Sequence, residues 1–438
     1  MRRRSRSLLV PVILFGAALA WPMRAATLDT ARPEDVGFSA ERMARVRESL
    51  QRHIDEGNVS GVVTIVARRG RIVHFEAQGR MDVTADTPMV KDAIFRLAST
   101  SKPITGVAVM MLVEEGRIRL TDPVSRFIPE FSELDKVAVA RPAGRGGRGG
   151  PAAGGRGRGE GPPEYDLVTV ARPITIRDLL THGSGLVSGG LGASAAPTLA
   201  PRSPSDTLAT YIPRLAAVSL DFQPGTLWRY SGQAGFDVLS RVVEVVSGLP
   251  YDQFLTQRIF DPLGMKDTGF VVPEASQPRL AAIHRSTPNG LERGENQNML
   301  MSATYFSGAG GMVSTAEDYL QFAQMLVNGG ELNGTRLLSP RTIDLMTANH
   351  TGDMVNGQFG RPARGMGFGL SVQTVLDPVA AGLSQSPGTF GWAGAFGTNV
   401  NMDPKEQMVT VFFVQHQGGG IGTVRNDFES AVMQAIVD

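Results

Sequence analysis

The pattern of apolar and polar positions changes sharply near the start of the chain. Residues 33–58 have the mixture of charged and apolar positions that is typical of a helix, and this pattern stops at Gly57. Two runs rich in β-branched residues follow at 62–67 and 72–77, joined by residues 68–71. Short runs of this kind around a glycine-containing connection are typical of a β-hairpin. The pattern therefore predicts a helix followed by two antiparallel strands.

A similar pattern returns near the C-terminus. Residues 398–402 and 407–415 flank the segment 403–406, which again predicts a hairpin, and a final helix is expected roughly over 427–436. Between the two hairpins the patterning is mostly helical, most clearly at 236–248. Strands near both termini with helices between them predict an α/β sheet domain built from both ends of the chain, plus a mostly helical insertion domain.

The first 26 residues differ from the rest of the chain. Arginines within residues 2–6 precede an apolar run over 8–20, and small residues follow. This order predicts a secretory signal peptide, because the apolar run is too short to span a membrane. Cleavage is expected at the end of that run or near residues 25–26. The mature domain, residues 27–438, is then expected to be periplasmic or secreted, without a membrane partner.

Residues 141–163 break the pattern, because they consist almost entirely of Gly, Arg, Pro and Ala. This composition cannot bury a core, so the segment is interpreted as a flexible surface insertion. A Gly/Arg tract can also contact RNA. Here it is a single short patch on a chain that is expected to be exported, which favours the surface loop.

Composition limits the chemistry of the chain. Its 438 residues, 42% hydrophobic and 19% charged, suffice for one large domain or two closely packed ones. The absence of Cys excludes disulfides, thiol nucleophiles, thiolate metal ligands and a lipid-modified N-terminus. The formal charge of +1 becomes 1 − 5 = −4 without the five arginines of residues 1–26, so nothing indicates a nucleic-acid partner.

Candidate chemistry begins in the run FRLASTSKPITGVAVMMLVEEG, where Ser99 and Lys102 lie three residues apart at the start of an apolar, helix-like segment. Positions i and i+3 share a helix face, so the amine is expected within reach of the hydroxyl. A serine becomes a nucleophile when a base takes its proton, and a desolvated lysine can be that base. Arginine cannot, and the chain has 38 Arg but only 5 Lys. Taken alone, the spacing also fits a helix-capping serine and a surface lysine.

Two later segments can complete such a site. Tyr230, in WRYSG just before the 236–248 helix, can relay protons to and from a serine oxygen beside an ammonium group. Residues 391–395, GWAGA, are expected to open a strand, and their small side chains would expose a backbone N–H as an oxyanion donor. Each segment also has a structural interpretation: a partly buried, hydrogen-bonded tyrosine, and a glycine-rich turn before a hairpin.

The three motifs in this order resemble the serine β-lactamase-like superfamily of penicillin-recognising hydrolases, within it most closely class C β-lactamases and family VIII carboxylesterases. The resemblance covers roughly residues 35–436 and is supported by FRLASTSKPIT, LTDPVSRFIPEF, ITIRDLLTHGSGL, FDPLGMKDTGF, GAGGMVSTAEDYLQFAQMLVNGG and GWAGAFGTNVNMDP. It implies a β-lactamase/transpeptidase-like fold, in which helices flank an antiparallel sheet. It implies no metal or organic cofactor.

The resemblance also implies roles for individual residues. Ser99 matches the acylated nucleophile, Lys102 the lysine that activates it, and Tyr230 the tyrosine that shares the base and acid roles. The backbone N–H groups of Ser99 and Ala395 would form the oxyanion hole, and an N–H at a helix N-terminus suits this role. Substrate contacts are expected at four further positions: Gly232, Trp392, Ala393 and Gly394.

Two departures from the class C pattern bear on the substrate. Gly232 stands where an Asn amide usually binds the acylamino side chain of the substrate. Trp392 stands where a Lys usually adds positive charge, as in many family VIII esterases. Both changes are expected to weaken recognition of anionic, amide-bearing substrates, whereas a tryptophan offers an apolar surface. The expected function is therefore hydrolysis of small carboxylic esters through an acyl-enzyme on Ser99.

Several alternatives stay open. One is a β-lactamase, or an esterase with weak β-lactamase activity; another is a D-Ala-D-Ala carboxypeptidase or D-aminopeptidase; a third is a catalytically silent ligand-binding protein. His182 is expected to be structural, and His416 is a candidate for the cleft near the third motif. No Gly-x-Ser-x-Gly motif of α/β-hydrolases occurs. The expected partner is a small ester or β-lactam-like molecule, and the oligomeric state stays open.

Overall fold

The computed structural model describes residues 28–140, 165–297, 300–355 and 364–438. The predicted signal peptide and the Gly/Arg-rich insertion lie outside these residues. Among the helices of the described ranges, none is both long enough and apolar enough to cross a bilayer.

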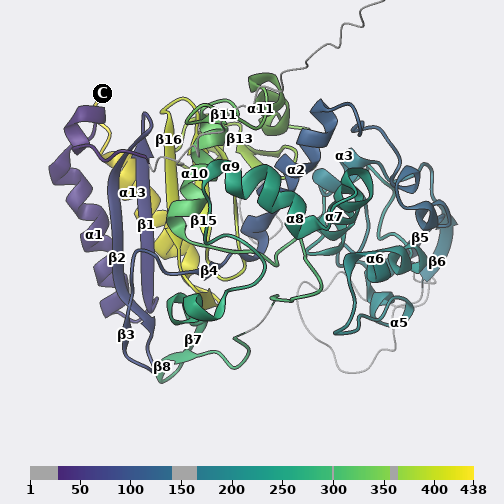
Figure 1. The fold of residues 1–438 in the computed structure, drawn as a ribbon, viewed down its shortest axis with the longest axis horizontal. Helices are drawn as coiled ribbons and strands as arrows, with labels where there is room; N and C mark the ends of the chain where they lie inside the picture. Colours follow the sequence, from purple (N-terminus) through teal and green to yellow (C-terminus); the bar gives the residue numbers. More distant parts are fainter. Residues whose placement is uncertain (1–27, 141–164, 298–299, 356–363) are drawn as a thin grey trace, which may run out of the picture.

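A large antiparallel sheet organises the fold, and both ends of the chain contribute to it (Figure 1). The strands on one side of the sheet come from the last quarter of the chain, and those on the other side come from residues 61–88. This arrangement confirms the predicted architecture. Within the described residues, eight strands pair antiparallel in this order: β12 (Met366–Phe368), β13 (Gln373–Val375), β14 (Phe390–Ala393), β15 (Asn399–Asp403), β16 (Met408–Phe413), β1 (Gly61–Arg68), β2 (Arg71–Asp82) and β3 (Thr87–Pro88).

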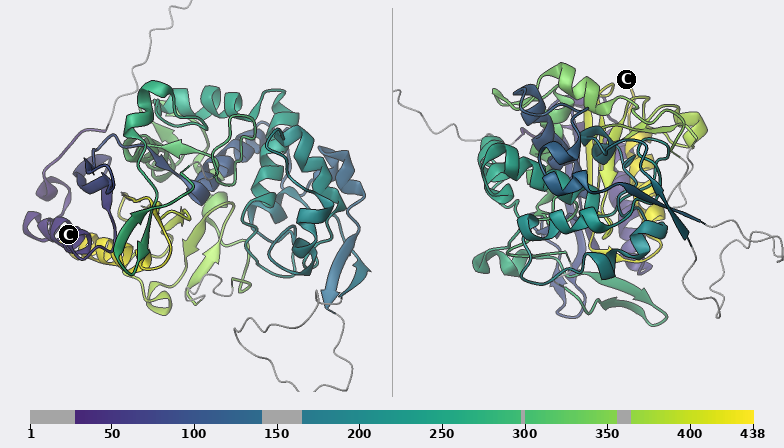
Figure 2. Two further views of the ribbon diagram at one scale, coloured as in Figure 1. Left: turned by 90° about the horizontal axis from the view of Figure 1, so that it is seen from below. Right: turned by 90° about the vertical axis from the view of Figure 1, so that its right-hand side faces the viewer.

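Helices cover both faces of this sheet. The terminal helices α1 (Ala40–Asp55) and α13 (Ile421–Gln434) lie side by side on one face, whereas α10 (Ala316–Val327) lies on the other (Figures 1 and 2). Because side chains alternate along a strand, Val62 packs with the terminal helices and Val63 with the opposite core. Strand β1 is consequently buried along its whole length, which explains its mostly apolar sequence. Its two polar side chains, Thr64 and Arg68, are hydrogen-bonded.

A mostly helical region fills the right-hand side of Figure 1. In the sequence, it falls between the sheet strands near the N-terminus and those near the C-terminus. The helix α2 (Lys102–Glu114) is almost wholly buried at the junction of this region with the sheet. The region contains α3 (Ile176–Leu180), α4 (Leu191–Ser194), α5 (Ala196–Leu199), α6 (Leu208–Tyr211), α7 (Ala234–Ser247) and the hairpin β5 (Lys136–Ala140) and β6 (Tyr165–Thr169). The helices α8 (Tyr251–Leu255) and α9 (Asp261–Leu263) lead back from it to the sheet, where α9 lies beside α10 (Figure 1).

Short elements link these parts. They are β4 (Phe95–Arg96) paired with β9 (Val313–Ser314), β7 (His284–Thr287) with β8 (Gly290–Arg293) and β17 (His416–Gln417), β10 (Glu331–Leu332) with β11 (Thr335–Arg336), and the helices α11 (Pro340–Thr347) and α12 (Pro378–Ala381).

The boundaries of both terminal helices differ from the prediction. The segment 33–58 is interrupted at Gly37, whose φ of 81° ends a 3₁₀ turn, and α1 starts after Ser39, whose Oγ accepts the Arg42 N–H. At the other end, α13 begins at Ile421, six residues before the predicted start at 427. Burial of apolar side chains four residues apart on its inner face, Val424, Phe428 and Val432, offsets the low helix propensity of the glycines at its start.

Both predicted hairpins are present. The connection in the first hairpin and the last strand of the second are shorter than predicted. In the first, β1 and β2 are joined by Arg69 and Gly70 alone, and both have positive φ, at 53° and 72°. Two residues with positive φ form the turn that suits the twist of a hairpin. In the second, β16 ends at Phe413 and not at residue 415.

Candidate active site

Ser99 lies in a 3₁₀ turn over Ala98–Ser101, between β4 and α2. Ala98 has a φ of 47°, a conformation that costs a non-glycine residue about 1–3 kcal/mol. The turn leaves Ser99 partly exposed, whereas its neighbours Ala98 and Thr100 are buried. Residues i and i+3 are eclipsed in a 3₁₀ turn, so Lys102 still lies beside Ser99 although the turn is not α-helical.

Lys102 is fully buried, and its amino group contacts three oxygen atoms. Its Nζ lies 3.1 Å from Ser99 Oγ, 2.8 Å from the Gly232 carbonyl oxygen and 2.7 Å from the Ala309 carbonyl oxygen. Carbonyl oxygens can only accept hydrogen bonds, so the two backbone groups fix the direction of the amine. The alternative of a surface lysine is therefore wrong.

Tyr230 contacts the same serine, although the two residues are 131 positions apart in the sequence. Its hydroxyl lies 2.6 Å from Ser99 Oγ, and its ring centroid lies 4.9 Å from Lys102 Nζ. The residue precedes α7, as predicted. Ser99 Oγ is thus within hydrogen-bond distance of an amine and a phenol, both of which can take part in proton transfer. The structure brings together all three side chains that the sequence analysis selected.

The third motif lies at the end of the inner sheet strand β14, next to these residues. Trp392 and Ala393 end strand β14, and Gly394 and Ala395 begin the turn to β15, so the motif closes a strand where we expected it to open one. The Trp392 ring centroid lies 5.6 Å from that of Tyr230. Gly232, two residues after Tyr230, is exposed and contributes its carbonyl oxygen to Lys102.

Side-chain hydrogen bonds hold the β14–β15 turn against the Ser99 turn. Thr398 Oγ1 lies 2.9 Å from Thr100 Oγ1 and donates to the Leu97 carbonyl oxygen over 2.9 Å. Within the described residues, the N–H groups of Ser99 and Ala395 donate no hydrogen bond to the protein. Two unused N–H groups on adjacent turns are what an oxyanion hole requires.

His182 lies in a buried aromatic cluster that supports Tyr230. Its ring centroid is 4.5 Å from that of Tyr230 and 5.2 Å from that of Phe368, and its Nδ1 accepts the Ser231 N–H over 3.3 Å. Burial, aided by the positive charge of Lys102, lowers the pKa of His182 well below its usual value. The imidazole is therefore neutral at physiological pH, which fits the structural role expected for it.

His416 does not line an open cleft. The side chain is buried, and its Nε2 lies 3.4 Å from Ser286 Oγ. Burial lowers the pKa of His416, with a further contribution from His284. This burial argues against the expectation that His416 lines the cleft near the third motif.

Two residues near Lys102 were missed by the sequence analysis. Ala309 supplies a carbonyl oxygen to Lys102, and its own N–H donates to Asp237 Oδ1 over 3.2 Å. The glycine-rich phrase GAGGMVST marked this segment without indicating a role. An acidic residue within the apolar run FDVLSRVV was the available signal for Asp237.

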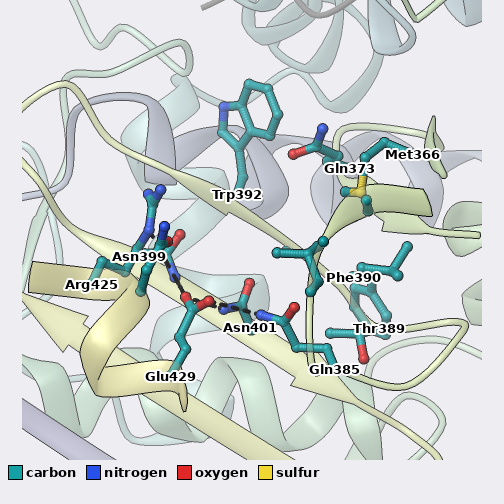
Figure 3. Close-up of a pocket in the computed structure, with 16 residues that line it drawn as sticks. Met366, Gln373, Gln385, Thr389, Phe390, Trp392, Asn399, Asn401, Arg425 and Glu429 are labelled. Atoms are coloured by element: carbon teal, nitrogen blue, oxygen red, sulfur yellow. Dashed lines mark hydrogen bonds and ion pairs between the residues drawn. The ribbon is translucent and has the colours of Figure 1, made fainter. Parts of the chain in front are cut away.

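A cavity of about 260 Å³ lies along β14 and borders Trp392 (Figure 3). Glu429 of α13 accepts hydrogen bonds from three amide side chains in its wall, those of Gln385, Asn399 and Asn401. Arg425 lies 3.9 Å from Glu429 at its closest, and burial lowers the pKa of Arg425. One wall of the cavity therefore carries a hydrogen-bonded polar cluster, whereas Met366, Phe390 and Trp392 contribute apolar surface.

A lysine and a tyrosine that converge on one serine, beside an antiparallel sheet flanked by helices, define a serine hydrolase of the penicillin-recognising type. The family model described as Beta-lactamase matches residues 46–433, and the chain belongs to this family. The prediction of a β-lactamase/transpeptidase-like fold is thus confirmed.

Similar proteins include esterases. Esterase EstB of Burkholderia gladioli is 33% identical over 408 residues, which cover 86% of this chain and 90% of EstB. Lovastatin esterase of Penicillium rubens is 29% identical over 391 residues, which cover 84% of this chain and 91% of that protein. Among solved structures, EstCE1, described as a hydrolase with promiscuous acyltransferase activity, has a TM-score of 0.73 and 28% identity, covering 90% of this chain and 99% of EstCE1.

Proposed function

We propose that the protein is an exported carboxylesterase that works through an acyl-enzyme on Ser99. The observation that carries the proposal is the contact of Ser99 Oγ with both Lys102 Nζ, at 3.1 Å, and the Tyr230 hydroxyl, at 2.6 Å. A partly exposed hydroxyl between a buried amine and a phenol suits a nucleophile that forms an acyl-enzyme. Export rests on the sequence of residues 1–26, as described above.

The first half of the reaction acylates the enzyme. Ser99 Oγ attacks the ester carbonyl carbon while its proton passes to the Lys102–Tyr230 pair. The N–H groups of Ser99 and Ala395 stabilise the negative charge on the carbonyl oxygen. The tetrahedral intermediate then collapses, the bond to the alcohol oxygen breaks, and the Lys102–Tyr230 pair returns the proton to that oxygen.

The second half releases the acid. A water molecule attacks the acyl carbon while the Lys102–Tyr230 pair accepts its proton. The bond to Ser99 Oγ breaks, and the proton returns to the serine. One ester and one water thus give one alcohol and one carboxylic acid, and the enzyme is restored.

Residues around Ser99 favour esters over β-lactams and peptides. Gly232 offers no side-chain amide to a substrate, and Trp392 presents an aromatic ring where a cation would otherwise attract a carboxylate. The similarity to EstB and lovastatin esterase supports the same substrate class. A β-lactamase, a D-Ala-D-Ala carboxypeptidase or D-aminopeptidase, and a silent binding protein remain the alternatives, and each makes a different prediction below.

A substrate panel tests this ranking. We expect the wild-type protein to hydrolyse p-nitrophenyl acetate or butyrate with a higher kcat/KM than a chromogenic cephalosporin, and to release no D-Ala from a D-Ala-D-Ala peptide. Weak cephalosporin turnover is compatible with the proposal. A cephalosporin or D-Ala peptide processed more efficiently than every ester would contradict it. Stable acylation without turnover of any substrate would favour the silent binding protein.

The turn that carries Ala395 provides a second test. A Cβ at Gly394 would lie 2.2 Å from the Leu97 carbonyl oxygen and 2.3 Å from Thr398 Oγ1, so Gly394→Ala must displace the turn from Ser99. We expect kcat for the best ester to fall roughly 10- to 100-fold, with a smaller change in KM, because the oxyanion donor is misplaced. Steady-state kinetics measure both constants.

Gly269→Ala is the matched control for that substitution. A Cβ at Gly269 meets no atom within 4 Å, so this variant should keep the kcat of the wild type. If Gly394→Ala has the same kcat as Gly269→Ala, the oxyanion role of the turn is wrong.

A further inference from the structure

Asp237 is a carboxylate buried on α7, close to the candidate site yet outside the proposed machinery. Its Oδ1 accepts hydrogen bonds from Ser307 Oγ, at 2.6 Å, and from the Ala309 N–H, at 3.2 Å, and its Oδ2 accepts one from the Tyr305 hydroxyl, at 2.9 Å. A backbone N–H can only donate, and both hydroxyls can donate, so this set of partners fits the ionised carboxylate. Burial raises the pKa of Asp237, but these three hydrogen bonds and the positive charge of Lys102 act in the opposite direction and favour the charged form. Because burial of a charged group costs free energy, a buried carboxylate with three hydrogen-bond donors suggests a specific role.

The same residue, Ala309, connects Asp237 to Lys102. Its N–H points to the carboxylate, and its carbonyl oxygen accepts from Lys102 Nζ over 2.7 Å. The neighbouring Gly308 is held as well, because its carbonyl oxygen accepts from Thr105 Oγ1 of α2 over 2.8 Å. A Cβ at Gly308 would lie 2.1 Å from Ser240 Oγ, so the segment sits tightly against α7. Asp237 therefore fixes the position of the Ala309 carbonyl oxygen, which in turn orients the Lys102 amino group.

We propose that Asp237 is a positioning residue for the Ser99 site, which holds the Ala309 carbonyl against Lys102 Nζ and provides the buried negative charge that balances Lys102. This inference rests on the roles proposed above for Ser99 and Lys102. In this proposal Asp237 contacts neither the substrate nor Ser99, and it acts through the backbone of Ala309.

The charge of Asp237 should be visible in the pH dependence of the reaction. A buried anion favours the protonated form of a neighbouring base, and removal of the anion takes this effect away. The ascending limb of the pH profile is therefore expected to move to lower pH. The titratable groups that face Asp237 and Lys102 are Tyr211, Tyr251 and Tyr305 around the carboxylate, and Tyr230 and the neutral His182 around the amine.

Asp237→Asn tests the proposal, since it keeps the shape of the side chain and removes its charge. Two quantities are followed from pH 5 to pH 10: kcat and KM for the best ester, and the second-order rate of Ser99 labelling by a fluorophosphonate probe. We expect kcat and the labelling rate to fall roughly 10- to 100-fold while KM changes little, because Lys102 is misplaced. The ascending limb should move to lower pH. A kcat within twofold of the wild type, or an unmoved limb, overturns the proposal.

Asp318→Asn is the matched control. Asp318 is also a buried carboxyl, whose pKa burial raises to about 6, and it accepts hydrogen bonds from the Asp267 N–H and Thr268 Oγ1 at the start of α10. This variant should change thermal stability without moving the pH profile. The same shift of the limb in Asp318→Asn would contradict a specific role for Asp237.

Ser307→Ala keeps the test decisive if Asp237→Asn does not fold. It removes one donor from the carboxylate and retains its charge. We expect a fall of a few fold in kcat with an unmoved limb, and an unchanged kcat would overturn the positioning role. The labelling rate separates the two proposals: if the wild type is labelled on Ser99 but hydrolyses no ester, the ester assignment fails while Asp237 is still tested.

Discussion

Replacing Ser99 by alanine is expected to remove ester hydrolysis almost completely, with kcat falling roughly 10⁴-fold or more. The variant lacks the only atom that can form the acyl-enzyme in the proposed mechanism, and neither Lys102 nor Tyr230 can substitute for it. The fold should be unaffected, because Ser99 is partly exposed and, among the described residues, its Oγ hydrogen-bonds with these two side chains alone. Hydrolysis of p-nitrophenyl acetate or butyrate measures the loss.

Ser101→Ala is the matched control, because Ser101 lies two positions further along the same turn. Its hydroxyl is fully buried and has no hydrogen-bond partner within the described residues. Removal of an unpartnered buried hydroxyl should leave activity unchanged and stability equal or higher. If Ser99→Ala retains the turnover of Ser101→Ala, the nucleophile has been wrongly assigned.

Lys102→Met is expected to lower kcat about 10²- to 10⁴-fold, because it removes the amine and retains a side chain of similar length. The loss should appear equally in the rate of fluorophosphonate labelling, since both reactions need an activated Ser99. Stability changes in two opposing ways. The carbonyl groups of Gly232 and Ala309 lose their donor, at about 1–3 kcal/mol each, whereas a buried charge is removed.

Lys91→Met provides the comparison for that loss. Lys91 is exposed and lies 4.9 Å from the ring centroid of Phe75, so it should keep the activity of the wild type. Retention of more than a tenth of the wild-type kcat by Lys102→Met would contradict the account, provided that circular dichroism shows both variants to be folded.

The parts of the site that depend on side-chain type could be predicted from the sequence. Ser99 and Lys102 are close in sequence, so local geometry alone brings them together, and the structure confirms this contact. Tyr230 and the Trp392 segment could be selected only through the resemblance to a family, because nothing local indicates that they meet Ser99. The sheet was predictable because both terminal hairpins carry strong β-branched patterns.

The parts that depend on backbone atoms could not be predicted. The Ala309 oxygen acts through its position, and an alanine gives no sign of such a role. Asp237 was visible as an acidic residue in an apolar helix, but its partner segment lies about 70 residues away in the sequence. Helix α13 was predicted too short because Gly420 and Gly422, a residue type with low helix propensity, lie just before and within its first turn, and tertiary packing overrides that local preference.

The most direct test of the account is the location of the acyl group. The protein is mixed with p-nitrophenyl butyrate, quenched with acid within milliseconds, digested, and analysed by tandem mass spectrometry. We predict a butyryl group on Ser99, in the tryptic peptide that begins at Leu97, and its absence from the Ser99→Ala protein. A butyryl group on any other residue, or turnover of the ester without an acylated Ser99, would contradict the central claim.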